Sequence, residues 1–162
     1  MVATEEKRIE FTSLRVTDPH EINKLIALIH DEYFEGNDIE YHRENGILEI
    51  PYRRIFHSGP RRTVHNWLFY IVKEVDVIRA KMRIHHVQEF ELNDPDKTGI
   101  YSFNNVDYDP DSLTLLLNST ANLRLRMKVS HILIESQDLE ITGKSRISFF
   151  FFTEISSGRV YN

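Results

Sequence analysis

Hydrophobic and polar residues alternate along much of the chain, a pattern typical of half-buried β-strands. The alternation is clearest over 113–117 and 123–129, two segments joined by a polar loop at 118–122, and it predicts a hairpin there. Further strands are expected over 10–16, 100–108 and 148–155.

One segment has helical spacing instead. Asp18 is a favourable N-cap, Pro19 stands at the first helical position and Glu21 lies three residues after the cap. The apolar residues that follow form one stripe: Ile22, Leu25, Ile26, Ile29 and Tyr33. This pattern predicts a helix over 19–35 that ends before Gly36 and docks on the sheet by its stripe.

Asn45-Gly46 favours a two-residue type I′ hairpin turn. That turn would place Tyr41 opposite Ile50. It would place His42 beside Glu49 on the other face.

The segment 61–92 contains no Gly or Pro and is the most ambiguous. Its residues Trp67, Ile71, Val75, Ile78 and Met82 also fit helical spacing. The density of Val, Ile and aromatic residues favours strands over 63–73 and 77–92, with a break at 74–76.

Turns are expected at 93–99, 109–111 and 142–144, where Gly, Pro, Asn and Asp gather. The run Phe149 to Phe152 has no polar alternation, so we expect both of its faces to be covered, one of them by the helix.

The fold class indicated is mainly β (α+β). We expect an antiparallel β-meander of about eight strands forming a barrel or sandwich, with one N-terminal amphipathic helix packed on it. The 162 residues contain no linker, which favours a single domain, 1–162, with an ordered core over about 9–157.

Charge and composition argue against several classes of function. The net charge of −5 argues against bulk attraction to nucleic acid or anionic lipid. Cysteine is absent, which excludes disulfides and thiolate metal sites. The first ten residues are charged, and no run of about 20 apolar residues is present. We therefore expect no secretory signal, no membrane association and a cytoplasmic location.

Two basic stripes are the main candidate binding site. Cations occupy alternate positions in two segments that read as strands: Arg79, Lys81 and Arg83, and then Arg124, Arg126 and Lys128. If the two strands are close in the sheet, the six charges share a surface that could bind an acidic protein partner. The competing interpretation is an ordinary solvent-facing strand surface. No aromatic residues that could stack on bases are interleaved with the cations, which weakens a nucleic-acid role.

Other polar clusters give weaker evidence for a binding site. Arg53, Arg54, Arg61 and Arg62 flank a turn but lack the spacing of a phosphate-binding loop. A metal could be bound where four side chains converge: His42, Glu40, Glu44 and Glu49. The acidic loops at 94–99 and 107–111 resemble calcium-binding loops in composition, but they lack the EF-hand pattern. We expect no metal, no cofactor and no catalytic residue, because no catalytic motif is present.

These observations favour a non-enzymatic protein-interaction module. The alternatives are a small-ligand carrier or enzyme, and a nucleic-acid-binding protein that uses the basic stripes. A carrier cavity would be lined by aromatic residues: Trp67, Phe69, Phe90, Phe103 and Phe149 to Phe152.

Overall fold

The computed structural model describes residues 11–56, 59–150 and 153–157. Within these residues, twelve strands form one antiparallel sheet, accompanied by one α-helix and two short 3₁₀ helices. In chain order the elements are β1 Ser13–Val16, η1 Pro19–Glu21, α1 Ile22–Ile29, β2 Tyr33–Glu35, η2 Gly36–Asp38, β3 Glu40–His42, β4 Ile47–Ile55, β5 Arg62–Trp67, β6 Tyr70–Ile84, β7 Val87–Asn93, β8 Ile100–Asp109, β9 Thr114–Ser119, β10 Arg124–Val129, β11 Ile134–Phe150 and β12 Thr153–Ser157.

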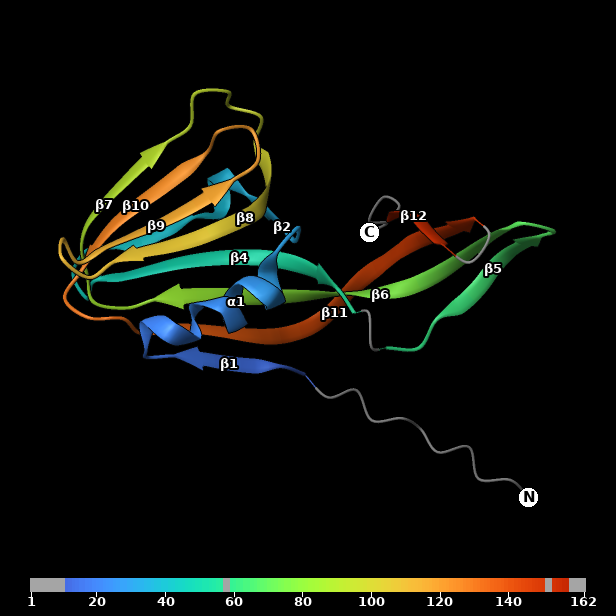
Figure 1. Ribbon diagram of the computed structural model, residues 1–162, viewed down its shortest axis with the longest axis horizontal. Coiled ribbons are helices and arrows are strands. Elements are labelled where there is room, and N and C mark those ends of the chain that lie inside the picture. Colours follow the sequence, from blue (N-terminus) through green and yellow to red (C-terminus); the bar gives the residue numbers. More distant parts are fainter. Residues whose placement is uncertain (1–10, 57–58, 151–152, 158–162) are drawn as a thin grey trace, which may run out of the picture.

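The predicted fold class is confirmed: the structure is mainly antiparallel β with one amphipathic helix near its N-terminus. The strand order is β1-β11-β6-β4-β2-β8-β9-β10-β7, while β3, β5 and β12 pair with β4, β6 and β11. The sheet curls around its inner face but does not close, so β1 and β7 remain at its two ends (Figure 1).

The core lies on the concave inner face. Helix α1 presents Ile22, Leu25 and Ile29 to it, and these side chains are buried against the strands. Phe34 stacks on Phe103 with ring centroids 4.4 Å apart. Alternate residues of β4, β6, β9 and β10 join this cluster, as the period of two requires.

Strands β6 and β11, with 15 and 17 residues, are much longer than the others. Their distal parts, 70–76 and 144–150, pair with each other beyond the end of β4 and leave the rest of the sheet. Flanked by β5 and β12, they form a four-stranded extension with the order β5-β6-β11-β12. We call this extension the arm and the rest of the molecule the body (Figure 1).

The turn expected at 142–144 is absent. Strand β11 runs through these residues, and its register against β6 shifts between Asp138 and Glu140 and again between Ile141 and Gly143. Such bulges insert an extra residue and bend the strand. Gly143 therefore marks the bend where the arm begins, not a chain reversal.

The predicted helix over 19–35 is too long. Asp18 caps the first turn as expected, its Oδ1 accepting a hydrogen bond from His20 N at 2.8 Å. The helix ends at Ile29, and Asp31 takes a φ of 65° as its N–H turns to the Phe103 carbonyl. Residues 33–35 then join the sheet as β2, because burial of Phe34 between β4 and β8 outweighs helical propensity.

The hairpin register also differs from the prediction. Tyr41 pairs with Leu48, not Ile50, and Glu49 lies opposite Glu40, because the loop contains four residues, 43–46. The shift is two positions, so each side chain keeps its predicted face. The carbonyl of Gly46 accepts a hydrogen bond from Val87 N at 2.9 Å, which holds the loop on the next connection.

The prediction of strands in the segment 61–92 is confirmed, but the predicted break at 74–76 is wrong. The chain reverses at Leu68 and Phe69 and again at His85 and His86, and β6 is continuous through 74–76. The expected burial of 149–152 is wrong for Phe150, which is 47% exposed, because it lies on the arm, away from α1. Residues 151 and 152 lie outside the described residues.

Candidate functional site

The arm ends in three consecutive large apolar residues. Strand β5 finishes at Trp67, Leu68 and Phe69 make the turn, and β6 begins at Tyr70. The exposed fractions are 71% for Trp67, 85% for Leu68 and 54% for Phe69. We call these three residues the arm tip. A hairpin turn normally carries Gly, Asn or Asp, so local turn chemistry does not account for apolar residues here.

The arm has a small core of its own, separate from that of the body. Ile55, Val75 and Ile147 are buried together, with Phe149 packed against them. The Nζ of Lys73 lies 5.6 Å from the centroid of the Phe149 ring, a cation–π arrangement. The arm is thus folded structure, and its tip is exposed although apolar packing exists a few residues away.

A buried polar cluster lies where the arm leaves the body. Arg54 on β4 pairs with Asp138 on β11, and Tyr52 shares a 2.6 Å hydrogen bond with Ser136. The carboxylate of Glu32 accepts a hydrogen bond from Ile55 N at 3.1 Å. Burial raises the pKa of Glu32 to about 8 and that of Tyr52 to about 12, because both charged forms lose solvation. These groups hold β4 to β11 at the root of the arm.

The predicted basic residues of β6 lie on the convex outer face, where each of them contacts a carboxylate. Lys81 Nζ and Arg83 Nε contact Glu49 at 2.8 and 2.7 Å, and Arg79 contacts Glu140 at 2.7 Å. The hydrogen bond from Lys81 is the main cause that lowers the pKa of Glu49, with Arg83 adding to it.

The predicted basic residues of β10 are placed differently. Arg124, Arg126 and Lys128 are exposed, and no ion pair of theirs is found in the part of the chain that the structure describes. Arg126 lies opposite Glu91 of β7, and Lys128 lies opposite Glu89. Four strands separate β10 from β6, so the structure does not bring the two stripes together on neighbouring strands.

The four arginines near residues 53–62 do not form a clamp. Arg54 turns inward to Asp138, whereas Arg53 is exposed on β4. Arg61 lies 5.9 Å from the Phe149 ring centroid, and Arg62 is exposed on β5. Residues 57 and 58 of the intervening loop lie outside the described residues.

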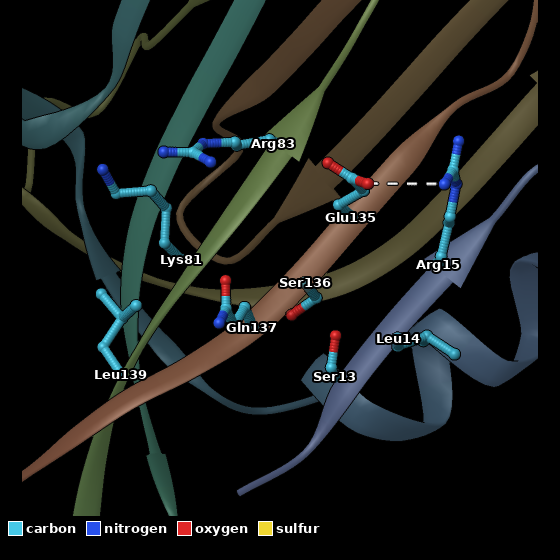
Figure 2. Close-up of a pocket in the computed structure, with 9 residues that line it drawn as sticks. All are labelled: Ser13, Leu14, Arg15, Lys81, Arg83, Glu135, Ser136, Gln137 and Leu139. Carbon is cyan, nitrogen blue, oxygen red and sulfur yellow. Dashed lines mark ion pairs between the residues drawn. The ribbon is translucent and has the colours of Figure 1, made fainter.

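An open depression of about 250 Å³ lies on the outer face between β1, β6 and β11. Its polar lining includes Arg15, Lys81, Arg83, Glu135 and Gln137, and Leu139 stands at one end (Figure 2). Lys81 and Arg83 are paired with Glu49, and Arg15 Nε lies 3.9 Å from Glu135. The depression is open on the outer face and its cations contact carboxylates, and it is not the interior cavity that a carrier would need.

The aromatic residues expected to line such a cavity are dispersed. Phe103 is in the body core, and Phe90 packs on Tyr41 with ring centroids 5.5 Å apart. Trp67 and Phe69 lie at the arm tip. They therefore do not gather around one interior space.

Glu40, His42 and Glu49 come together as metal-ligating groups. One ligand atom from each lies within 4.8 Å of the others, whereas Glu44 is outside this group. Both carboxylate oxygens of Glu49 already accept hydrogen bonds from cationic groups, Oε1 from Arg83 and Oε2 from Lys81. A divalent ion would meet these two positive charges, so we assign no metal to the cluster.

The acidic loops build turns. Asp94 accepts hydrogen bonds from Lys97 N at 3.0 Å and from the Tyr101 hydroxyl at 2.5 Å. Asp109 accepts from Asp111 N at 3.0 Å and from the Ser112 hydroxyl at 2.6 Å. Their carboxylates are used within the loops, as the turn interpretation of these segments requires.

Three histidines cluster at the opposite end from the arm, where β6 turns into β7. His86 has a φ of 59°, and its ring centroid lies 3.8 Å from that of His131. His86 is exposed, and a loss of solvation lowers its pKa, which the neighbouring His131 and His85 lower further. His85 Nε2 lies 2.9 Å from Glu135 Oε2. His85 and His86 occupy the turn between β6 and β7 and belong to neither strand.

Sequence reasoning missed the arm tip as a candidate site. The signal was the run Trp67-Leu68-Phe69-Tyr70, which was assigned to the middle of a strand. A turn at Leu68 and Phe69 has no Gly, Pro, Asn or Asp to mark it, so only the structure shows that this run projects outward.

Comparison of the chain with protein-family models, curated proteins and solved structures found no match. No helix among the described residues has the length and apolar character needed to cross a bilayer; α1, with eight residues, is the only α-helix among them.

Proposed function

We propose that the chain is a non-enzymatic protein-interaction module that binds its partner through the arm tip. The observation that carries this proposal is the exposure of three consecutive large apolar residues, Trp67, Leu68 and Phe69, at the end of a folded extension. Single exposed apolar residues are ordinary on soluble proteins, but contiguous patches mark interaction sites.

The chemistry of the tip suits a protein interface. Tryptophan is enriched among the residues that dominate binding energy, because one rigid side chain offers a large area at low entropic cost. Within the part of the chain that the structure describes, the tip residues are members of neither the body core nor the core of the arm. A partner that covers them would remove their exposed apolar surface from water.

A second face is the exposed stripe on β10. Because Arg124, Arg126 and Lys128 form no ion pair among the described residues, this stripe keeps the charge with which it could attract an acidic partner. Each cation of the stripe on β6 already contacts a carboxylate, so we expect the basic contribution to binding to come from β10.

The test is quantitative affinity purification from cells that express the chain naturally, comparing the native chain with Leu68→Glu. The matched control is Leu139→Glu, since Leu139 is a partly exposed leucine on the outer face of the body. We expect one set of co-purified proteins to be lost with Leu68→Glu and kept with Leu139→Glu. Equal recovery with both variants would refute a role for the tip. The contribution of β10 is measured separately from that of the tip by a triple variant: Arg124→Glu, Arg126→Glu and Lys128→Glu.

A further inference from the structure

Five strands pair on one side only in the described structure, and β5 and β7 are two of them, beside β1, β3 and β12. Strand β5 pairs with β6 on one side only, and its six residues are all exposed. Strand β7 pairs with β10 on one side only, and it ends the strand order of the sheet. An edge strand offers a row of unpaired backbone N–H and C=O groups to another chain.

The two edges match in length and in charge. Strand β5 has six residues, including Arg62 and His65, and no carboxylate. Strand β7 has seven residues, including Glu89 and Glu91, and no cation. Within the described contacts, neither Glu89 nor Glu91 forms an ion pair with the cations that face them from β10. A basic strand added to the open edge of β7 would lie beside these two carboxylates, on the side away from the cations of β10.

The apolar residues also correspond. Strand β5 ends in the arm tip, and Leu92 near the end of β7 is 43% exposed because no strand covers it beyond the sheet edge. Only the start of β7 has hydrogen-bond partners along its open edge. There Val87 N donates to the Gly46 carbonyl, and the Val87 carbonyl accepts from the Tyr41 hydroxyl. Most of the β7 edge is left open for another strand.

Within one chain these edges cannot meet. Strand β5 lies on the arm and β7 lies at the far end of the body (Figure 1). Any pairing between them must join two molecules.

We propose that the occupant of the arm is a second copy of this chain, with β5 of one copy added to the β7 edge of the next. This inference rests on the proposed function of the arm and names its partner. Backbone pairing supplies affinity, as in other cases of strand addition, and the opposite charges of the two edges supply register and specificity. Each copy offers one arm and one acceptor edge, so the contact is head-to-tail and produces a ring or an open chain of copies.

The experiment is sedimentation velocity of the purified full chain over a wide concentration range. We expect a monomer at low concentration and larger species as concentration rises. Arg62→Glu should raise the dissociation constant about tenfold, and so should Glu89→Arg with Glu91→Arg, since each places like charges at the contact. The variant that combines all three changes should recover assembly. Arg53→Glu, the reversal of an exposed arginine on the body, should assemble like the native chain.

A chain that stays monomeric at every concentration overturns the inference, and so does assembly that the charge reversals leave unchanged. Circular dichroism of each variant shows whether it is folded, and the combined variant provides the decisive comparison because its recovery cannot follow from misfolding. The proposed function fails separately: a monomeric chain whose arm tip still captures a different protein keeps that function and loses only self-association.

Discussion

Arg54 and Asp138 form an ion pair across the inner face of the sheet at the root of the arm. Arg54 Nε lies 2.8 Å from Asp138 Oδ1, and the second carboxylate oxygen also accepts a hydrogen bond from Thr12 N at 2.7 Å. The pair joins β4 to β11 over the intervening strand β6, where Ala80 lies opposite Asp138 and leaves room for the crossing. Three strands are thereby fixed where the arm begins.

Removing one partner of this pair should be costly. Asp138→Asn leaves the Arg54 guanidinium buried without its counter-charge, and we expect a loss of about 3–5 kcal/mol in the free energy of unfolding. Glu140→Gln removes an exposed ion pair with Arg79 and should cost about 0–1 kcal/mol. Urea denaturation measures both. A loss for Asp138→Asn no larger than that for Glu140→Gln would show that the buried pair does not stabilise the root of the arm.

Glu32 should make stability depend on pH. Its pKa in the folded chain is about 8, against an ordinary value of 4.5. Between these values the unfolded chain releases a proton that the folded chain retains, so this contribution to stability falls as pH rises from 4.5 to 8 and is constant above.

Glu32→Gln keeps the side chain neutral at every pH. The variant should match the native chain near pH 4.5 and exceed it in free energy of unfolding by several kcal/mol near pH 9. Denaturation curves of both proteins across this range provide the measurement. Parallel pH profiles would contradict the assigned environment of Glu32.

The pKa of His86 should depend on the neighbouring His131. His131→Gln removes the positive charge that would oppose protonation of His86, so the pKa of His86 should rise. The rise should be partial, because the loss of solvation is the larger cause of the lowered value. NMR titration of the imidazole resonances tests this, and an unchanged His86 pKa in the variant would show that the two rings do not interact electrostatically.

Substitution of a buried apolar residue of the arm should lower the free energy of unfolding much more than substitution of an exposed one. Ile147 is fully buried in the core of the arm, and Ile147→Ala should cost about 2–5 kcal/mol. Leu68 is exposed, so Leu68→Glu should change the free energy of unfolding by no more than about 0.5 kcal/mol. Thermal denaturation followed by circular dichroism checks both. A large loss for Leu68→Glu would place this side chain in a structural contact and remove the basis for a docking surface.

Sequence reasoning predicted the strands that obey a strict period of two. Leu115 and Leu117, with Leu125 and Met127 opposite them, are buried as the alternation requires. The prediction failed where tertiary contacts override local preference, as when Phe34 enters the sheet. It also failed at Gly143, where a bulge and a turn favour the same residue.

The candidate site was less accessible to prediction than the fold. Alternating cations do not show which carboxylates contact them, and Glu49 becomes the partner of both Lys81 and Arg83 only through the pairing of β4 with β6. The arm could not be foreseen, because the chain reversal at Leu68 carries no turn-forming residue.

The most direct test of the arm tip as a docking surface is photo-cross-linking from position 68. A photoreactive amino acid replaces Leu68, or Leu139 as the control, and the chain is irradiated in its native extract. Our account predicts a defined covalent adduct from position 68 and none from position 139. An adduct of twice the chain's mass would identify a second copy, and any other defined mass would identify a different protein. The absence of any adduct specific to position 68 would contradict the account.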